Sequence, residues 1–226
     1  MKFNTKTVHK GQKPEKLYGS VSLPIYQTST FKQNEIGEYI YDYSRAGNPT
    51  RSSLEENICS LENGKDAVAF SSGLSAITSI VQLFSSGDHM IFTDNVYGGT
   101  FRLLDTIMKK YNIEQSWVDT SSIDQVASTI KDNTKLIFIE SPTNPMMTLS
   151  DIKAICDFAH KKDILVAVDN TFMSPYFQRP IELGADLVIH STTKYLNGHS
   201  DVIGGVVISK DQDLGEKLHY IQMSVG

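Results

Sequence analysis

The sequence predicts a three-layer α/β sandwich built around a mostly parallel sheet. Short apolar runs rich in β-branched and aromatic residues recur along the chain, and stretches with helical periodicity separate most of them. Strands and helices that alternate at this spacing are typical of a parallel sheet covered by helices on both faces. With 226 residues, 40% of them hydrophobic, the chain is long enough to bury the core of one large domain.

The predicted elements follow an N-terminal arm. Residues 1–50 lack a clear period and contain several prolines, so we expect an extended arm there and a folded domain over residues 51–226. Asn48-Pro49-Thr50 opens a first helix, which Asn63-Gly64 ends. The expected strands are Ala67–Phe70, His89–Thr93, Glu114–Val118, Leu136–Glu140, Leu165–Asp169, Leu187–His190 and Val206–Ile208. The expected helices between them are Gly73–Leu83, Thr100–Lys110, Ile123–Ile130 and Leu149–Lys161.

Composition excludes several classes of protein. The net charge of −5 and the lack of a basic block disfavour a nucleic-acid or anionic-membrane partner. Cys59 and Cys156 are too few and too far apart for a disulfide framework or a zinc site, so we expect two core thiols and no metal. No segment resembles a signal sequence or a membrane span, which predicts a cytoplasmic protein.

Polar side chains follow the predicted strands at the edge where ligands bind in parallel sheets. Each of five strands is followed by such a segment. The segments are Ser71-Ser72-Gly73, Asn95-Val96-Tyr97, Ser141–Pro145, Asp169-Asn170 and Ser191–Lys194. A ligand site is therefore expected at this edge.

Two of these residues suit pyridoxal 5′-phosphate (PLP), which needs a lysine for a Schiff base and an acid against its ring nitrogen. Lys194 and Asp169 are the candidates, although each alone is more often a surface lysine or a polar strand end. Ser71–Leu74, at a strand-to-helix junction, could hold the phosphate with free backbone N–H groups, and otherwise is a helix cap. Ser191 and Thr193 could add hydroxyl donors. The sequence contains neither a Walker A pattern nor G-x-G-x-x-G, which disfavours a nucleotide ligand.

Six motifs taken together resemble the Cys/Met-metabolism PLP-dependent enzymes, which catalyse trans-sulfuration, and they run in order through essentially the whole chain. They are Tyr41–Thr50, Ser71-Ser72-Gly73, Tyr97–Thr100, Ser141–Pro145, Val168–Thr171 and His190–Tyr195. The resemblance implies a large domain of the aspartate-aminotransferase type, PLP as cofactor, and a homo-oligomer, a dimer of dimers, with shared active sites.

The resemblance also implies roles for single residues. Lys194 would bind the cofactor and transfer protons, Asp169 would pair with the ring nitrogen, and Tyr97 would stack on the ring and assist catalysis. Asn144 would lie near the cofactor's 3-oxygen and the substrate carboxylate. The phosphate-binding residues would be Ser72, Gly73, Leu74, Ser191 and Thr193, with Tyr43 and Arg45 supplied to a neighbouring subunit.

Two further residues bear on the substrate, a small sulfur amino acid. Arg102, shortly after Tyr97, matches the position that recognises a distal carboxylate in cystathionine γ-synthases and γ-lyases, and common β-lyases lack it. Asp42 matches an acid placed against the distal amine. The resemblance implies a cystathionine or homocysteine γ-lyase, a C–S elimination enzyme, with γ-synthase (γ-replacement on an O-acylhomoserine) as the alternative.

The family continues with a smaller C-terminal domain, which supplies an arginine for the substrate's α-carboxylate. The chain ends at Gly226 before such a domain. We therefore expect a chain without the C-terminal small domain, and a further alternative is a cofactor-binding but catalytically inactive module.

Overall fold

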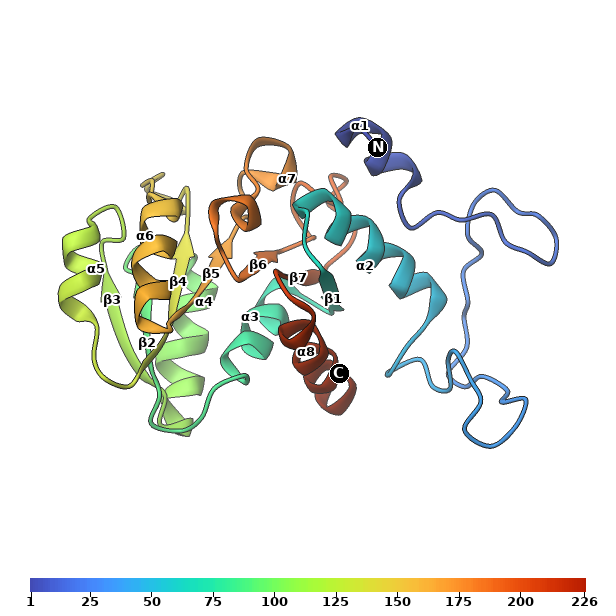
Figure 1. Cartoon of the computed structure of the whole chain (residues 1–226), viewed down its shortest axis with the longest axis horizontal. Coiled ribbons are helices and arrows are strands. Elements are labelled where there is room, and N and C mark those ends of the chain that lie inside the picture. The colour runs from blue at the N-terminus through green and yellow to red at the C-terminus, as the bar shows by residue number, and fades with distance from the viewer.

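The computed structural model describes all residues, 1–226, and contains one seven-stranded sheet in the order β1-β7-β6-β5-β4-β2-β3 (Figure 1). Strand β7 runs antiparallel to both of its neighbours, and all the other pairings are parallel. The strands are β1 (Asp66–Phe70), β2 (His89–Thr93), β3 (Glu114–Val118), β4 (Thr134–Glu140), β5 (Leu165–Asp169), β6 (Leu187–His190) and β7 (Gly205–Ser209). The predicted mostly parallel sheet is confirmed, with strand ends that differ by two residues at most.

Helices cover both faces of the sheet and make the predicted three layers. One core cluster joins the sheet to α3, α8 and the helical stretch after β2, and the other joins it to α2, α5 and α6. The helices are α1 (Phe3–His9), α2 (Pro49–Glu62), α3 (Gly73–Val81), α4 (Gly98–Arg102), η1 (Leu103–Ile107), η2 (Met108–Tyr111), α5 (Ile123–Thr129), α6 (Ile152–Ala159), η3 (His160–Lys162), α7 (Ser174–Phe177), η4 (Pro180–Leu183) and α8 (Gln212–Val225). Because side chains alternate along each strand, the central strands contribute apolar residues to both clusters, and their sequences are continuous apolar runs.

Local sequence accounts for the ends of α2. The Asn48 side chain accepts a hydrogen bond from the Thr50 N–H, and Pro49 occupies the first helical position, where no N–H is needed. Asn63 ends the helix in the left-handed conformation, with φ of 57°. The predicted helix is confirmed at both ends.

Two expected helices differ in detail. The stretch predicted at Thr100–Lys110 begins earlier, as α4, and continues through the π-helix η1 and the 3₁₀ helix η2. The helix predicted to start at Leu149 starts later, because the Asp151 side chain caps it by accepting from the Ala154 N–H at 2.9 Å.

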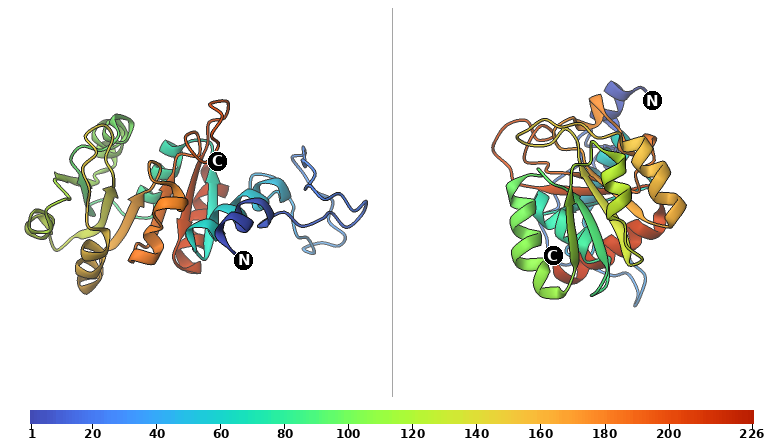
Figure 2. Two further views of the ribbon diagram at one scale, coloured as in Figure 1. Left: turned by 90° about the horizontal axis from the view of Figure 1, so that it is seen from above. Right: turned by 90° about the vertical axis from the view of Figure 1, so that its left-hand side faces the viewer.

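The prediction of an extended arm is wrong for its first residues, which form α1. This helix buries no residue, and hydrogen bonds to α2 and its C-cap hold it in place. Lys6 Nζ donates to Ser60 O and Asn63 Oδ1, and Asn57 Nδ2 donates to Lys10 O, just after the helix. The start of the chain therefore packs on its own α2. The rest of the arm projects beyond α2, away from the sheet (Figure 2), and exposes large apolar side chains. These are Leu17, Tyr18, Val21, Ile25, Ile36 and Ile40.

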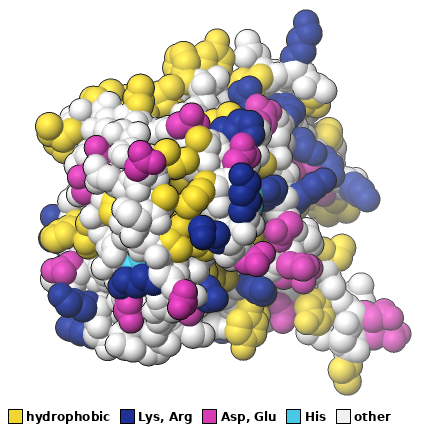
Figure 3. All heavy atoms as spheres, turned by 60° about the vertical axis from the view of Figure 1, so that its left-hand side comes forward, with side chains coloured by type: hydrophobic (Ala, Val, Ile, Leu, Met, Phe, Trp, Pro, Cys, Tyr) yellow, Lys and Arg dark blue, Asp and Glu magenta, His cyan; other side chains and the backbone are white.

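Other expectations concern the surface and the thiols. Cys156 is fully buried and Cys59 packs against the same cluster, and both are free, as predicted. On the face drawn in Figure 3, acidic and basic side chains are interspersed. No helix is both long enough and apolar enough to span a membrane.

Candidate cofactor site

The amino end of α3 forms a close-packed cradle with the loop after β6. A Cβ added at Gly73 would lie 2.8 Å from the Ser191 Cβ and 3.2 Å from its Oγ. One added at Gly205, which opens β7, would lie 2.1 Å from the Ser72 carbonyl oxygen. Only glycine fits at these positions, so the start of α3 packs closely against Ser191 and the start of β7. Such a helix end binds anions, and a phosphate ester suits it.

The loop after β6 carries Lys194. The Ser191 N–H donates to Thr171 Oγ1 at 2.8 Å, which ties this loop to the end of β5. A turn follows, closed by the Lys194 N–H on Ser191 O, and the Lys194 side chain is exposed. The Thr193 hydroxyl bonds Gly204 N and O, at 3.1 and 3.2 Å. In this structure Thr193 thus joins the loop to the segment before β7, and its expected contact with a phosphate stays a prediction.

Asp169 ends β5 beside this loop. Its Oδ1 accepts from the Thr171 N–H at 3.0 Å. Burial raises the pKa of the Asp169 carboxyl, and the hydrogen bonds from Thr171 offset part of that rise. A protonated pyridine nitrogen would supply the cation that a buried carboxylate requires. The residues present therefore fit PLP: an anion cradle, a lysine on a loop, and a partly buried acid lie at one edge of the sheet.

Glu140, at the end of β4, is a residue that the sequence reasoning did not single out. It is 6% exposed, and its carboxylate accepts from the Tyr97 N–H through Oε2 and from the Asn144 N–H through Oε1, both at 2.8 Å. The structure therefore joins Tyr97 and Asn144, two expected site residues, through one buried side chain. A signal was available, because an acid at the end of a continuous apolar strand needs a partner.

The Tyr97 ring lies against Gly99, where an added Cβ would come within 2.4 Å of Cε1. Arg102 is exposed on α4, and its Nη1 would be 3.5 Å from a Cβ at Gly98. The Asp42 carboxylate accepts from the Tyr43 N–H at 2.6 Å. No hydrogen bond or ion pair joins Asp42 to Arg102 within this chain.

Tyr43 and Arg45 lie on the turn before α2, and neither hydrogen-bonds to the other expected phosphate ligands. Arg45 lies over the Tyr43 ring, 5.5 Å from its centroid, and donates to Met223 O of α8. Neither side chain hydrogen-bonds to the Lys194 loop. Their expected role in a neighbouring subunit's site stays a prediction.

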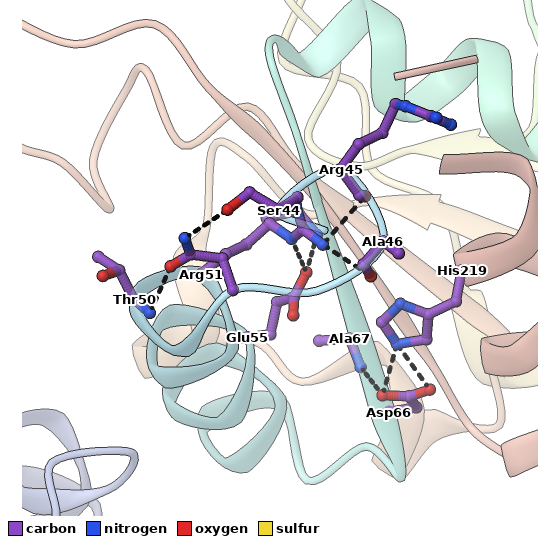
Figure 4. Close-up of polar contacts among 11 residues, drawn as sticks. Ser44, Arg45, Ala46, Thr50, Arg51, Glu55, Asp66, Ala67 and His219 are labelled. Atoms are coloured by element: carbon purple, nitrogen blue, oxygen red, sulfur yellow. Dashed lines mark hydrogen bonds and ion pairs between the residues drawn. The ribbon is translucent and has the colours of Figure 1, made fainter. Parts of the chain in front are cut away.

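Arg51 holds this turn in place (Figure 4). Its Nη1 donates to Ser44 O at 2.8 Å, and its Nη2 donates to Ala46 O at 3.0 Å. Its Nε lies 3.4 Å from Oε1 of the buried Glu55, which also accepts from the Ala69 N–H of β1. The turn is therefore fastened to the sheet through a charged pair.

The comparison with protein families agrees with this geometry. Residues 4–226 match the family of Cys/Met metabolism PLP-dependent enzymes. The chain belongs to this family. PLP is the cofactor of the Cys/Met metabolism enzymes, as the resemblance implied.

Several relatives within the family share about half of the residues. Cystathionine gamma-lyase of Bacillus subtilis and cystathionine beta-lyase of Lactococcus lactis are each 50% identical, over 100% and 99% of this chain. A probable cystathionine gamma-synthase of Herpetosiphon aurantiacus is 47% identical over 99% of it. This chain spans 60%, 59% and 70% of these proteins, respectively.

The fold is also that of a solved family member. The crystal structure of cystathionine gamma-lyase from Lactobacillus plantarum, complexed with L-serine, matches with a TM-score of 0.98 and 48% identity. The match covers 100% of this chain and 59% of that one. The predicted α/β fold of a PLP-dependent enzyme is therefore confirmed.

Proposed function

We propose that the protein is a PLP-dependent carbon–sulfur lyase of trans-sulfuration, which cleaves cystathionine and homocysteine by γ-elimination. The reaction consumes water and releases a ketoacid, ammonia and either cysteine or sulfide. The observation that carries the proposal is the placement of the Gly73–Ser191 cradle, Asp169 and the Lys194 loop at one edge of the sheet. The γ-lyase relative at 50% identity supports the same choice.

The proposed roles at the reacting end follow from charge and position. When bound, PLP supplies an electron sink for the charge that develops on the substrate carbon. Lys194 Nζ would hold the cofactor and move protons between substrate carbons, Asp169 would keep the ring nitrogen protonated, and Tyr97 would face the ring. The phosphate would lie on Ser72, Gly73, Leu74, Ser191 and Thr193.

Substrate choice is assigned to Asn144 and Arg102, which lie on or next to the segments around Tyr97, and to Asp42 on the N-terminal arm. Asn144 would orient the α-carboxylate and the cofactor's 3-oxygen. Arg102 offers a guanidinium fork for the distal carboxylate of cystathionine, and Asp42 offers an acid for the distal amine. Tyr43 and Arg45 would complete the phosphate site of a neighbouring subunit.

Assembly into a homo-oligomer is part of the proposal. The arm exposes large apolar side chains, including Ile36 and Ile40, which are 103% and 91% exposed. Exposed apolar surface of this kind marks interaction sites. The mass of the full-length protein, measured by light scattering, should correspond to a dimer of dimers, and a monomer would contradict the shared site.

Cystathionine γ-synthesis is the second candidate, supported by the probable γ-synthase relative at 47% identity. The deciding experiment incubates full-length protein and PLP with cystathionine, with homocysteine, and with an O-acylhomoserine plus cysteine. Ketoacid from the first two substrates supports the lyase. Cystathionine formed from the third mixture alone supports the synthase, and a protein that neither binds PLP nor forms product contradicts both.

A further inference from the structure

Glu140 connects two segments that follow different strands. The Tyr97 N–H belongs to the N-cap residue of α4, after β2, and the Asn144 N–H belongs to the turn after β4. One carboxylate accepts from both at 2.8 Å, one oxygen for each. The positions of the two segments relative to each other therefore depend on this side chain.

The surroundings make a carboxylate costly here. Glu140 is 6% exposed, and Asp169 is its register partner on β5. Burial, and then the charge of Asp169, raise the pKa of Glu140 to about 7. The hydrogen bonds from the Tyr97 and Asn144 N–H groups offset part of this rise. A neutral side chain would avoid the repulsion, but it could not accept two N–H bonds with equal strength.

We propose that Glu140 is a positioning residue, which holds the Tyr97 ring and the Asn144 side chain in register with each other around the cofactor through their backbone N–H groups. The inference rests on the proposed function, because that function gives Tyr97 and Asn144 their roles. In this assignment Glu140 acts through Tyr97 and Asn144, because each of its oxygens accepts the N–H of one of them.

The test uses Glu140→Gln in the full-length holoenzyme. Glutamine has nearly the same shape, but its oxygen can accept from one of the two N–H groups while its NH₂ faces the other donor. We expect kcat to fall by about a hundredfold, since misplacement of about 1 Å costs that much. The visible circular dichroism of the bound cofactor, which reports ring orientation, should also change. In the cofactor-free protein, amide hydrogen exchange should become faster at Tyr97 and Asn144.

Asp186→Asn is the matched control. Asp186 is also a buried carboxylate, 7% exposed, and accepts from the Val166 N–H at 2.8 Å. It precedes β6 at the opposite edge of the same sheet. Its replacement should lower stability and leave kcat, the cofactor dichroism and the two exchange rates unchanged.

The outcomes separate this inference from the proposed function. A wild-type enzyme that binds PLP and forms product, beside a Glu140→Gln variant with wild-type kcat and dichroism, overturns the positioning role alone. Equal losses in Glu140→Gln and Asp186→Asn also overturn it, because they indicate a general effect of stability. A wild-type protein without bound PLP or product overturns the proposed function, and the inference with it.

Discussion

Glu140 and Asp169 lie side by side at the carboxyl ends of β4 and β5, as register partners on adjacent parallel strands. Two residues earlier the partners are Phe138 and Ala167, which both belong to the core cluster under α3. Since side chains alternate along a strand, the two carboxyl groups emerge on that same face. The sheet thus places two acids together, one assigned to the cofactor's ring nitrogen and one bonded to the Tyr97 and Asn144 turns.

This pair predicts a pH dependence of stability in the cofactor-free protein. The pKa of Glu140 is about 7 in the fold, above its usual 4.5. A raised pKa stabilises the fold while the group is protonated, and this contribution is lost as the pH rises from about 4.5 through about 7. The loss is roughly 3 kcal/mol. Denaturant unfolding across this pH range should therefore show a smaller fall in Glu140→Gln than in the wild type.

Asp169→Asn gives the control for the cause. It removes the neighbouring charge, which should bring the pKa of Glu140 closer to its usual value. It also removes the raised carboxyl pKa of Asp169 itself, so both changes should flatten the same pH profile. A profile that keeps the wild-type slope in both variants would show that Glu140 is not the group that titrates.

The assignment of Lys194 predicts the loss of both colour and turnover in Lys194→Ala. No other lysine follows a strand at this edge beside the Gly73–Ser191 cradle, so no other amine should replace it. The visible absorption of the PLP-loaded protein and the ketoacid assay measure the two effects. Lys161→Ala, on an exposed 3₁₀ turn, should behave as wild type. Borohydride reduction that fixes the cofactor to a different lysine would refute the assignment.

Arg102→Ala should raise the KM for cystathionine by about tenfold or more while sparing homocysteine, which has no distal carboxylate. The lost interaction is a charge-assisted hydrogen bond, worth roughly 1.5–3 kcal/mol, and its loss affects substrate binding. Lys110→Ala removes an exposed cation from the same helical stretch and should leave both KM values unchanged. Equal changes for the two substrates would instead indicate that Arg102 supports the structure of α4.

The sequence predicted what local patterns determine. Apolar runs located every strand, and Asn48 and Asn63 marked both ends of α2. Helix α8 could also have been predicted, since Asp211 caps it and Leu214 and Leu218 recur at helical spacing, but no helix is among those expected from the sequence after Val206–Ile208. Helix α1 could not be predicted from the sequence, because its polar residues show no apolar stripe and groups distant in the sequence, such as Asn57, hold it in place.

The candidate site likewise contains residues that the sequence predicts and residues that only the fold brings to attention. Asp169 and Lys194 are predicted from their positions after strands together with the motifs around them, and their roles stay predictions. Glu140 was read as the end of a strand, because its two partners come from turns whose proximity only the fold reveals. The contact between Thr193 and Gly204 cannot be predicted from the sequence for a similar reason, since β7 enters the sheet out of sequence order, between β1 and β6.

Arg51→Lys tests whether the turn that carries Tyr43 and Arg45 contributes to the phosphate site of a neighbouring subunit. The Arg51 fork bonds the carbonyl groups of Ser44 and Ala46 at 2.8 and 3.0 Å while Nε faces Glu55. A lysine keeps the charge but has a single nitrogen and cannot span these partners. The turn with Tyr43 and Arg45 should therefore loosen, and the Kd for PLP in the full-length assembly should rise about tenfold, which corresponds to roughly 1.4 kcal/mol.

The same substitution at Arg179, which pairs with Glu182 at 3.0 Å, is the control and should leave the Kd unchanged. The Kd is measured by titrating the cofactor-free protein with PLP, and far-ultraviolet circular dichroism checks that both variants fold. If Arg51→Lys binds PLP as the wild type does, the turn does not contribute to the phosphate site. Tyr43 and Arg45 make no hydrogen bond to the Lys194 loop of their own chain, so the partner is the expected recipient. Mixing Arg51→Lys subunits with Lys194→Ala subunits should then restore tight PLP binding at the remaining lysine, and a Kd that stays raised would place the contribution within the same chain.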